Sequence, residues 1–317
     1  MIRECLRRFS VFLSFLYKNK KNFLLKKEED IIQKINKFNS LNNYSIKKLP
    51  THNIFSTKIL ELVLEKKLNN FLRENFIQKV FFVHNRLYIF FLLIKIFFYH
   101  KKFKYLLKED HVGDPVRYFL YPKSSGNRIR EVFHLMEFEK FIQMPLKNIN
   151  EVFEFGGGYG NMARIFKKIN NKVSYTIFDT KEVNLIQYYY LNMLNLKTNW
   201  NQIKKKQINL INRIDKINFG NLKNKLFIAN WSLSETPIDI RDKIIKKFSK
   251  FNFFLISFQN SFENLDNYCY FSKLAKDLNN DNDIIYEIKK IPFINFLNLK
   301  KTHWYLFIKT KKYINEI

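Results

Sequence analysis

Two patterns of apolar and polar positions divide the chain near residue 110. Beyond residue 150, short apolar runs alternate with segments whose apolar residues recur every three or four positions. This alternation of strands and helices predicts an α/β domain, with a mostly parallel sheet that has helices on both faces. The seven predicted strands are residues 151–155, 173–178, 207–211, 226–230, 252–257, 284–288 and 303–308, and the last two form a C-terminal antiparallel hairpin.

The N-terminal pattern is helical. From Ile59 to Phe76 the apolar residues recur at intervals of three and four, which predicts one helix that begins near Ser56 or Thr57. Residues 81–99 are denser in aromatic side chains, and we expect them to pack on the sheet domain. A helix that lies on a membrane surface is the alternative for this segment.

A turn sequence, His111-Val-Gly-Asp-Pro115, separates the two patterns. We therefore predict a basic helical N-terminal region, residues 1–110, followed by a domain of residues 111–317. The net charge of +28 is shared between them, because residues 1–110 hold 23 Lys+Arg and 9 Asp+Glu and so carry 23 − 9 = +14. Lys, Asn, Ile and Phe are frequent throughout, as in proteins from A+T-rich genomes. We interpret the charge as a diffuse solvated surface that favours anionic substrates or lipid head groups, and expect no nucleic-acid partner.

Cysteine content and apolar runs limit the cellular setting. The two cysteines, Cys5 and Cys269, are far apart and lack metal-ligand spacing, which favours a reducing compartment without disulfides or a metal site. The apolar runs 9–17 and 87–94 are too short to span a membrane. We expect a cytoplasmic protein, with peripheral contact to the inner membrane surface left open.

Four of the seven glycines fall within five positions, between a strand and a helix. The segment reads Glu154-x-Gly156-x-Gly158-x-Gly160, with Gly157 also glycine, whereas a dinucleotide-binding G-x-G-x-x-G would need glycine at Asn161. Glycine permits positive φ and removes the Cβ that would strike a nucleotide. The pattern predicts a nucleotide-binding turn. The alternative is a chance glycine turn in an unrelated α/β protein.

This motif resembles the first motif of class I S-adenosylmethionine-dependent methyltransferases, and the seven strands with a terminal hairpin match their Rossmann-like fold. Asp179 ends the second predicted strand, where a carboxylate can accept both ribose hydroxyls. The predicted cofactor-binding residues are Glu154, Gly156, Gly157, Gly158, Tyr159, Gly160, Asp179 and Asn230, with Tyr159 expected beside the methionyl end of the cofactor.

A narrower resemblance covers residues 111–310. The order of the glycine motif, Asp179, Gln187-Tyr-Tyr-Tyr-Leu191, Ser232-Leu-Ser-Glu235 and the Asn-rich segment near Asp266-Asn267 is similar to a family of sugar O-methyltransferases found with genes for bacterial surface polysaccharides. The sequence departs from that family at Asp179-Thr-Lys181, where Asp-Leu-Pro is more usual. The resemblance implies methyl transfer from S-adenosylmethionine to a sugar hydroxyl of a surface polysaccharide or its precursor, free, nucleotide-linked or lipid-linked.

Such a reaction needs a group that accepts the hydroxyl proton. Glu235, after the fourth strand, is the first candidate, with capping of the next helix as the structural alternative, and His303 is the second. Trp231, Gln259, Asn260 and Asn264 offer an aromatic face and amides for a sugar, or serve packing and turns.

The helix predicted over residues 124–138 has two interpretations. Its Arg128, Arg130 and His134 form a solvated face, or they help to cover the cofactor. The rival functions are an RNA or small-molecule methyltransferase, and a non-catalytic glycan-binding protein on a decayed methyltransferase fold. No metal is expected, and the oligomeric state is left open.

Overall fold

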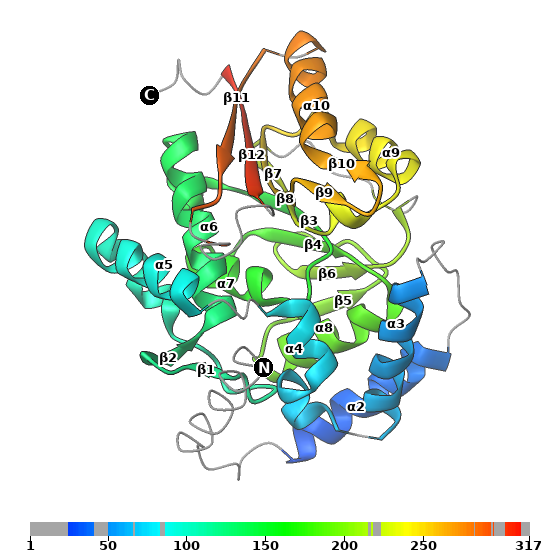
Figure 1. The fold of residues 1–317 in the computed structure, drawn as a ribbon. Coiled ribbons are helices and arrows are strands. Elements are labelled where there is room, and N and C mark those ends of the chain that lie inside the picture. Colours follow the sequence, from blue (N-terminus) through cyan, green and yellow to red (C-terminus); the bar gives the residue numbers. More distant parts are fainter. Residues whose placement is uncertain are drawn as a thin grey trace.

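The computed structural model describes residues 25–40, 50–65, 67–82, 86–214, 217, 223–281, 283–292, 294 and 302–311. Its centre is an eight-stranded sheet with the order β11-β12-β8-β7-β3-β4-β6-β5 (Figure 1). The strands are β3 (Glu151–Phe155), β4 (Ser174–Phe178), β5 (Thr198–Trp200), β6 (Ile208–Ile211), β7 (Lys225–Asn230), β8 (Phe253–Gln259), β11 (Ile284–Lys290) and β12 (His303–Thr310). Neighbouring strands are parallel except at β12, which is antiparallel to both β8 and β11.

The predicted Rossmann-like α/β fold with its C-terminal antiparallel hairpin is confirmed. Each of the seven predicted strands is present within two residues of its expected bounds. The eighth strand, β5, pairs with β6 at the sheet edge and was not expected. Its three residues, Thr-Asn-Trp, are all half-buried and form no apolar run, so the pattern of the sequence carries no strand signal there.

Helices cover both faces of the sheet. One face packs against α6 (Gly126–Ile142), α7 (Asn161–Ile169) and α8 (Lys181–Met193), and the other against α9 (Ile238–Phe248) and α10 (Asn267–Asp281). Strand β3 divides its side chains between the two cores: Val152 joins the first cluster, and Phe153 and Phe155 join the second. Glu154 therefore points to the face that carries α6, α7 and α8.

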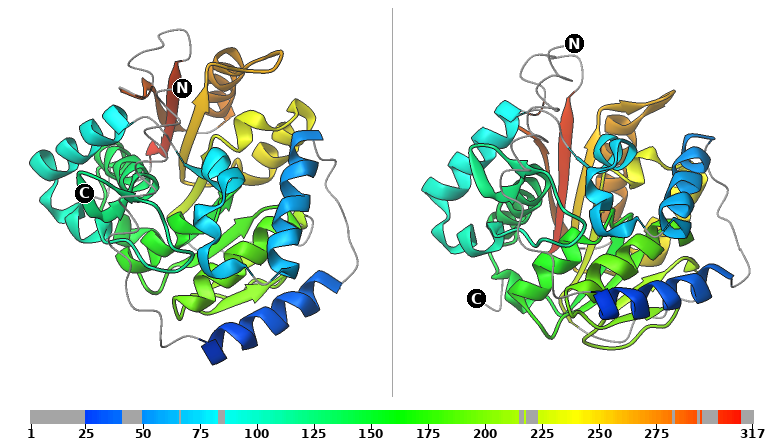
Figure 2. Two further views of the ribbon diagram at one scale, coloured as in Figure 1. Left: turned by 60° about the horizontal axis from the view of Figure 1, so that its bottom comes forward. Right: turned by 90° about the horizontal axis from the view of Figure 1, so that it is seen from below.

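The N-terminal helices extend the first of these two cores. They comprise α2 (Leu25–Ser40), α3 (Pro50–Leu64), η1 (Leu68–Arg73), α4 (Asn75–Phe81), α5 (Arg86–Tyr99) and η2 (Lys101–Leu107). Figure 2 shows α2 and α3 beside α8, on the opposite side of the molecule from α5, which packs on α6. Buried residues of this region, such as Leu72 and Leu92, belong to the same hydrophobic cluster as the sheet residue Val152. The division at residue 110 stays a prediction about domains.

The single helix predicted from Ser56 to Phe76 is wrong. Helix α3 begins earlier, at Pro50, and ends at Leu64, and a separate 3-10 segment, η1, follows. Asn70 has φ −131° and ψ 24°, outside the helical region, so the chain changes direction within η1. The apolar spacing continues across the break because both pieces bury their apolar side chains in one core.

Among the described residues, no single helix is long and apolar enough to cross a bilayer. Helices α4 and α5 together reach that length and composition, with a bend of 55° at the break between them.

The favoured interpretation of Arg128, Arg130 and His134 as a solvated face is also wrong. Arg128 and His134 are 0% exposed, because α6 lies between the sheet on one side and α5 and η2 on the other. Arg128 donates to Glu109 at 2.8 Å and to Asp110 at 2.9 Å, which compensates for its buried charge. Ser125 caps α6 by accepting from the backbone N–H of Arg128.

The remaining strands form two small hairpins. They are β1 (Arg117–Tyr118) with β2 (Tyr121–Ser125), and β9 (Ser261–Phe262) with β10 (Leu265–Asp266). The second hairpin directly follows β8, at the same edge of the sheet as the glycine turn, because β8 and β3 are parallel to the same neighbour, β7.

Candidate functional site

The glycine turn lies at the carboxyl end of β3, between that strand and α7. Gly156, Gly158 and Gly160 have φ values of 74°, 55° and 92°, which side chains rarely adopt. The backbone N–H of Gly156 donates to Phe178 at the end of β4 (2.9 Å), and that of Gly160 donates to Gly157 (2.9 Å). These bonds hold the turn against the neighbouring strand, at the edge of the sheet where α/β folds bind ligands.

Two of the glycines are also required by their neighbours. A Cβ on Gly156 would collide with the side chain of Ser232, whose hydroxyl donates to the carbonyl of Phe155. A Cβ on Gly157 would lie 2.6 Å from Ile177 Cγ2 and 2.9 Å from Glu154 Oε2. The side chains of Ser232, Ile177 and Glu154 therefore pack directly against the turn at Gly156 and Gly157.

Asp179 follows β4 and lies beside this turn. Its Oδ1 accepts from the backbone N–H of Thr180 at 2.8 Å, and its Oδ2 accepts from Gln187 Nε2 at 3.0 Å. Gln187, from α8, also donates to the carbonyl of Gly158 at 2.9 Å and so ties Asp179 to the glycine turn. Partial burial raises the pKa of Asp179 to about 7, against the opposing effect of hydrogen bonds that include one from the backbone of Gly157.

A second and a third carboxylate lie close to the same turn. Glu154 is 3% exposed and accepts from Tyr175 Oη at 2.8 Å, and burial with the nearby charge of Glu131 raises its pKa to about 8. Burial raises the pKa of Glu131, on α6, to about 7. Glu131 accepts from Asn161 Nδ2 at 2.7 Å, at the start of α7. Three partly or fully buried carboxyl groups thus surround the turn in a chain whose net charge is +28.

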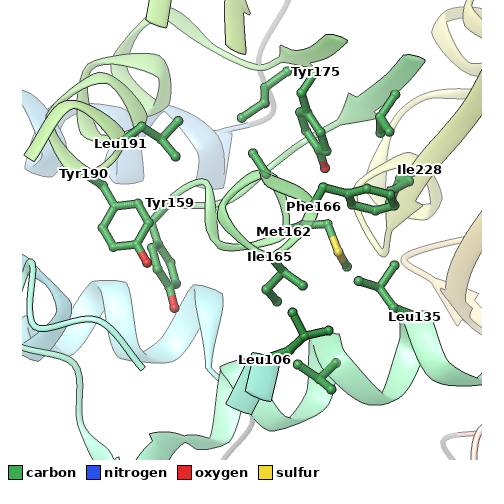
Figure 3. Close-up of a cluster of buried hydrophobic side chains, with 14 of the residues drawn as sticks. Leu106, Leu135, Tyr159, Met162, Ile165, Phe166, Tyr175, Tyr190, Leu191 and Ile228 are labelled. Carbon is green, nitrogen blue, oxygen red and sulfur yellow. The ribbon is translucent and has the colours of Figure 1, made fainter. Parts of the chain in front are cut away.

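Tyr159 lies in the aromatic core and not at the upper surface of the turn. It is 1% exposed, stacks on Phe82 at 6.1 Å between ring centroids and contacts Tyr190 edge-on at 5.0 Å. Figure 3 shows Tyr159 and Tyr190 side by side, from the glycine turn and α8, away from Tyr175. The Tyr159 ring is thus enclosed by other aromatic side chains, and the expected position of Tyr159 beside the methionyl end of a cofactor stays a prediction.

The N-terminal region reaches the glycine turn through Phe81, at the end of α4. A Cβ on Gly158 would lie 3.5 Å from the Phe81 ring, so this ring stands next to the turn. Arg130 Nη2 donates to the Phe81 carbonyl at 3.4 Å, and the Arg130 guanidinium lies 5.0 Å from the Trp231 ring. Arg130 therefore joins α4 to the end of β7, and a role of this helix in covering a cofactor stays a prediction.

Trp231 and His303 meet at the ends of β7 and β12. Trp231 has a positive φ of 64°, and its Nε1 lies 2.8 Å from His303 Nδ1. Since the indole N–H only donates, His303 Nδ1 accepts and the proton of the neutral ring is on Nε2. The buried ring of His134 contacts Trp231 edge-on at 5.4 Å, and burial lowers its pKa well below the usual value, which keeps it neutral.

Glu235 lies in the segment η5 (Leu233–Glu235), after β7. Its Oε1 is 3.5 Å from Gln259 Nε2, at the end of β8, and Gln259 Oε1 accepts from Ser234 Oγ at 2.8 Å. Burial raises the pKa of Glu235 to about 7. The alternative that Glu235 caps the next helix is wrong, because the N-cap of α9 is Pro237 and no side chain caps it.

The three asparagines of the predicted site have different surroundings. Asn230 is the last residue of β7, and its side chain accepts a hydrogen bond from Ser257 Oγ of the adjacent strand β8 at 2.9 Å. Asn260 accepts from Trp304 Nε1 at 3.2 Å, and its carbonyl accepts from the backbone of Asn267, so it stabilises the turn after β8. Asn264 is exposed between β9 and β10. Substrate binding by Asn260 and Asn264 stays a prediction.

Sequence reasoning did not place Glu131, Gln187, Asn161 and Ser232 in the site. Gln187 was noted within a family-like segment only, and Glu131 lies in a helix that was expected to face solvent. The glycine turn could have indicated Asn161, since it is the first residue of the helix that follows. Among the described residues, no group of three His, Cys, Asp or Glu side chains is arranged to hold a metal ion.

Comparisons with known proteins give structural likeness at low identity. No family model matches the chain, and no curated protein matches it. The small RNA methyltransferase HEN1 superposes with a TM-score of 0.41 at 11% identity, over 56% of this chain and 25% of that one. The mitomycin 7-O-methyltransferase MmcR gives 0.37 at 11%, over 58% and 57%. The N-terminal domain of human METTL16 in complex with SAH gives 0.39 at 10%, over 57% and 70%.

Proposed function

We propose that this protein is an S-adenosylmethionine-dependent methyltransferase whose acceptor is a sugar hydroxyl. The observation that carries the proposal is the set of carboxyl groups of Glu131, Glu154 and Asp179 around a glycine turn that presents backbone. In their ionised form these groups repel a pyrophosphate and attract a ligand with a sulfonium and an ammonium group, and such a ligand favours their ionisation. The contrast favours the methyl donor over a dinucleotide.

The residues present fit this cofactor. A Cβ at Gly156 or Gly157 would collide with neighbouring side chains, so both positions of the turn require glycine. Asp179 stands after β4, the place from which a carboxylate accepts ribose hydroxyls in related folds, and Gln187 fixes one of its oxygens. Phe81 and Arg130 border the same turn and would limit access of water.

When bound, S-adenosylmethionine supplies a methyl group activated by the sulfonium charge. The chain's own residues must then align the acceptor oxygen and take its proton. Glu235 suits this second task, because burial raises its pKa to about 7 and a carboxylate with that pKa is a stronger base than an exposed one. His303 is less suited, because its Nδ1 already accepts from Trp231 and its Nε2 carries the proton.

The sugar acceptor is supported by side chains at the ends of β7 and β8. Trp231 offers an aromatic face, and Gln259 holds its amide between Ser234 and Glu235. Aromatic faces and amides bind the CH surfaces and the hydroxyls of sugars. The family resemblance through Asp179, Tyr188–Tyr190 and Ser232–Glu235 adds a surface polysaccharide or its precursor as the substrate class.

Calorimetric titration with S-adenosylhomocysteine, S-adenosylmethionine and NAD⁺ tests the cofactor. We expect binding of the first two in the micromolar range and none of the third, and the absence of binding at millimolar cofactor would remove the enzyme proposal in favour of a non-catalytic protein.

The acceptor is tested with methyl-labelled cofactor and a panel of sugar nucleotides, lipid-linked oligosaccharides, polysaccharide and RNA. We expect label in a sugar fraction that is stable to RNase. The net charge of +28 would favour binding of RNA. Label found only in RNA would overturn the proposed sugar acceptor but would still support a methyltransferase.

A further inference from the structure

Helix α5 is apolar on all sides although it lies at the surface of the molecule. Its inner face, Tyr88, Ile89, Leu92, Leu93 and Ile96, is buried against the protein. The opposite stripe, at helical spacing, is Leu87, Phe91, Ile94 and Phe98, of which Leu87 and Phe98 are exposed and Phe91 and Ile94 are half-buried. A helix of this kind is typical of a protein interior or of contact with lipid, because exposing either apolar face to water is unfavourable.

Exposure at the two ends of α5 is high for such side chains. Phe98 is 76% exposed and Tyr99 75%, at the carboxyl end, and Leu87 is 49% exposed at the amino end. The one lysine of α5, Lys95, lies beside the outer stripe, with its Nζ 5.8 Å from the centroid of the Phe133 ring. Large exposed apolar patches on a protein surface mark interaction sites.

Further apolar side chains extend the patch at both ends of the helix. The tip of the β1–β2 hairpin carries Phe119, 36% exposed, and Leu120, 51% exposed. It is fixed to the start of α5, because Tyr118 Oη donates to the Arg86 carbonyl at 3.0 Å and the Arg86 guanidinium lies over the Phe119 ring. Beyond the other end, Tyr105 of η2 is 57% exposed.

A contrast with α2 shows that this is not the general surface of the chain. Helix α2 buries Ile31, Ile32 and Ile35, and its exposed positions include Glu29, Asp30 and Lys34. That is the polar outer face that a solvated helix normally has. Figure 1 shows α5 at the outside of the molecule, with no further element beyond it in the described part of the chain.

Charge around the patch identifies the partner. Residues 86–108 contain six basic residues, Arg86, Lys95, Lys101, Lys102, Lys104 and Lys108, and no Asp or Glu. Lys101 and Lys108 are exposed in and after η2, next to Tyr99 and Tyr105. Aromatic side chains with flanking lysines are the composition of protein surfaces that lie at the interface of an anionic bilayer.

We propose that the outer face of α5, with the β1–β2 tip and η2, docks on the surface of an anionic lipid bilayer. The aromatic side chains enter the interface, and the lysines lie at the level of the head groups. The proposal does not depend on the proposed function.

Sedimentation with vesicles of phosphatidylcholine, with and without phosphatidylglycerol, tests the docking. We expect the full-length protein to bind the anionic vesicles, to bind the neutral ones at least about tenfold more weakly, and to be released by salt. Phe98→Ser with Tyr99→Ser should weaken binding roughly tenfold or more. Lys101→Glu with Lys108→Glu should weaken it by a similar factor and reduce the salt dependence.

A matched control is available on the other side of the molecule. Ile54 and Leu64 of α3 are 61% and 66% exposed, so Ile54→Ser with Leu64→Ser removes a similar amount of exposed apolar surface far from α5 (Figure 2). Thermal unfolding of each variant excludes misfolding as the cause of a loss. Equal losses in the two double variants would overturn the proposal. It would also fail if the chain formed a dimer that Phe98→Ser and Tyr99→Ser dissociate, with no vesicle binding.

Discussion

The half of the site around β3 and β4 consists of backbone and buried carboxylates, whereas the half at the ends of β7, β8 and β12 consists of aromatic, amide and imidazole side chains. In the first half, Ser232, Ile177 and Glu154 pack under the glycine turn and leave no room for a Cβ. In the second half, side-chain hydrogen bonds join two pairs, Trp231 with His303 and Gln259 with Glu235. Substitutions in the first half should therefore cost cofactor binding, and those in the second should cost turnover and acceptor affinity.

The largest effect is expected for Gly156→Ala. The new residue would have φ near 74° and its Cβ would collide with Ser232, so cofactor affinity should fall by about 100-fold or more. Titration with S-adenosylhomocysteine measures this. Gly126→Ala is the control, because its Cβ would meet Ile89 at an ordinary 3.4 Å and φ there is not positive. Equal affinity of the two variants would contradict the rigid-turn interpretation.

Glu235→Gln should act on turnover instead. Loss of a general base lowers kcat by about 10²–10³-fold, while the affinity for S-adenosylhomocysteine should stay within a factor of about two, because Glu235 does not contact the turn. In the unmodified protein, kcat should rise as pH increases through about 7, where Glu235 loses its proton. If kcat of Glu235→Gln still falls as the pH decreases through about 7, the group that titrates there is not Glu235.

Asp179→Ala should weaken cofactor binding by about 10- to 100-fold, the range expected when the hydrogen bonds of two ribose hydroxyls to a charged group are lost. Asp239→Ala, on the outer face of α9, is the matched control and should have no effect. Gln187→Leu removes the bond that orients Asp179 and should give a smaller loss of affinity. A loss in Gln187→Leu that equals that of Asp179→Ala would show that the orientation of the carboxylate, and not its contact, limits binding.

Trp231→Phe keeps the aromatic face but removes the donor to His303 Nδ1. We expect the KM for the acceptor to rise by about three- to tenfold, with cofactor affinity unchanged, as measured by initial rates and by titration. A change in cofactor affinity with no change in KM would place Trp231 in the first half of the site.

The smallest effect concerns pH. The pKa values of Glu154, Glu131 and Asp179 are raised to about 8, 7 and 7, so these groups hold protons near neutral pH that a cationic ligand would displace. Affinity for S-adenosylmethionine should therefore increase a few-fold, roughly threefold, from pH 6 to pH 8, with proton release on binding. Titration in two buffers of different ionisation enthalpy measures the release. Glu154→Gln should reduce it, and S-adenosylhomocysteine, which lacks the sulfonium charge, should show less.

Much of the sheet and the glycine turn could be predicted because their signals are local. Each predicted strand is a short apolar run, and the turn is a concentration of glycine in a chain with only seven. Asp179 follows from its place directly after β4. Tyr188, Tyr189 and Tyr190 are all buried, because their helix is packed on the sheet and covered by α2 and α3.

The parts that could not be predicted depend on long-range packing. Glu131 and Arg130 lie on a helix whose sequence alternates charged and apolar residues, as a solvated helix does. Their partners, Asn161, Phe81 and Trp231, come from distant parts of the chain. Likewise, no local signal says that Arg130 reaches the Phe81 carbonyl, 49 residues earlier. The sequence therefore indicates the site residues that directly follow strands. The residues that cover and orient them become apparent only in the tertiary structure.

The reversed direction of β12 has a consequence for how such a protein can change over evolution. Because this strand alone runs against its neighbours, its first residue, His303, stands beside Gln259, at the end where the parallel strands finish. Under the proposed function, the last part of the chain would therefore change side chains around the acceptor without altering the turn after β3 or the carboxylates beside it. Acceptor choice would then diversify while cofactor binding is kept.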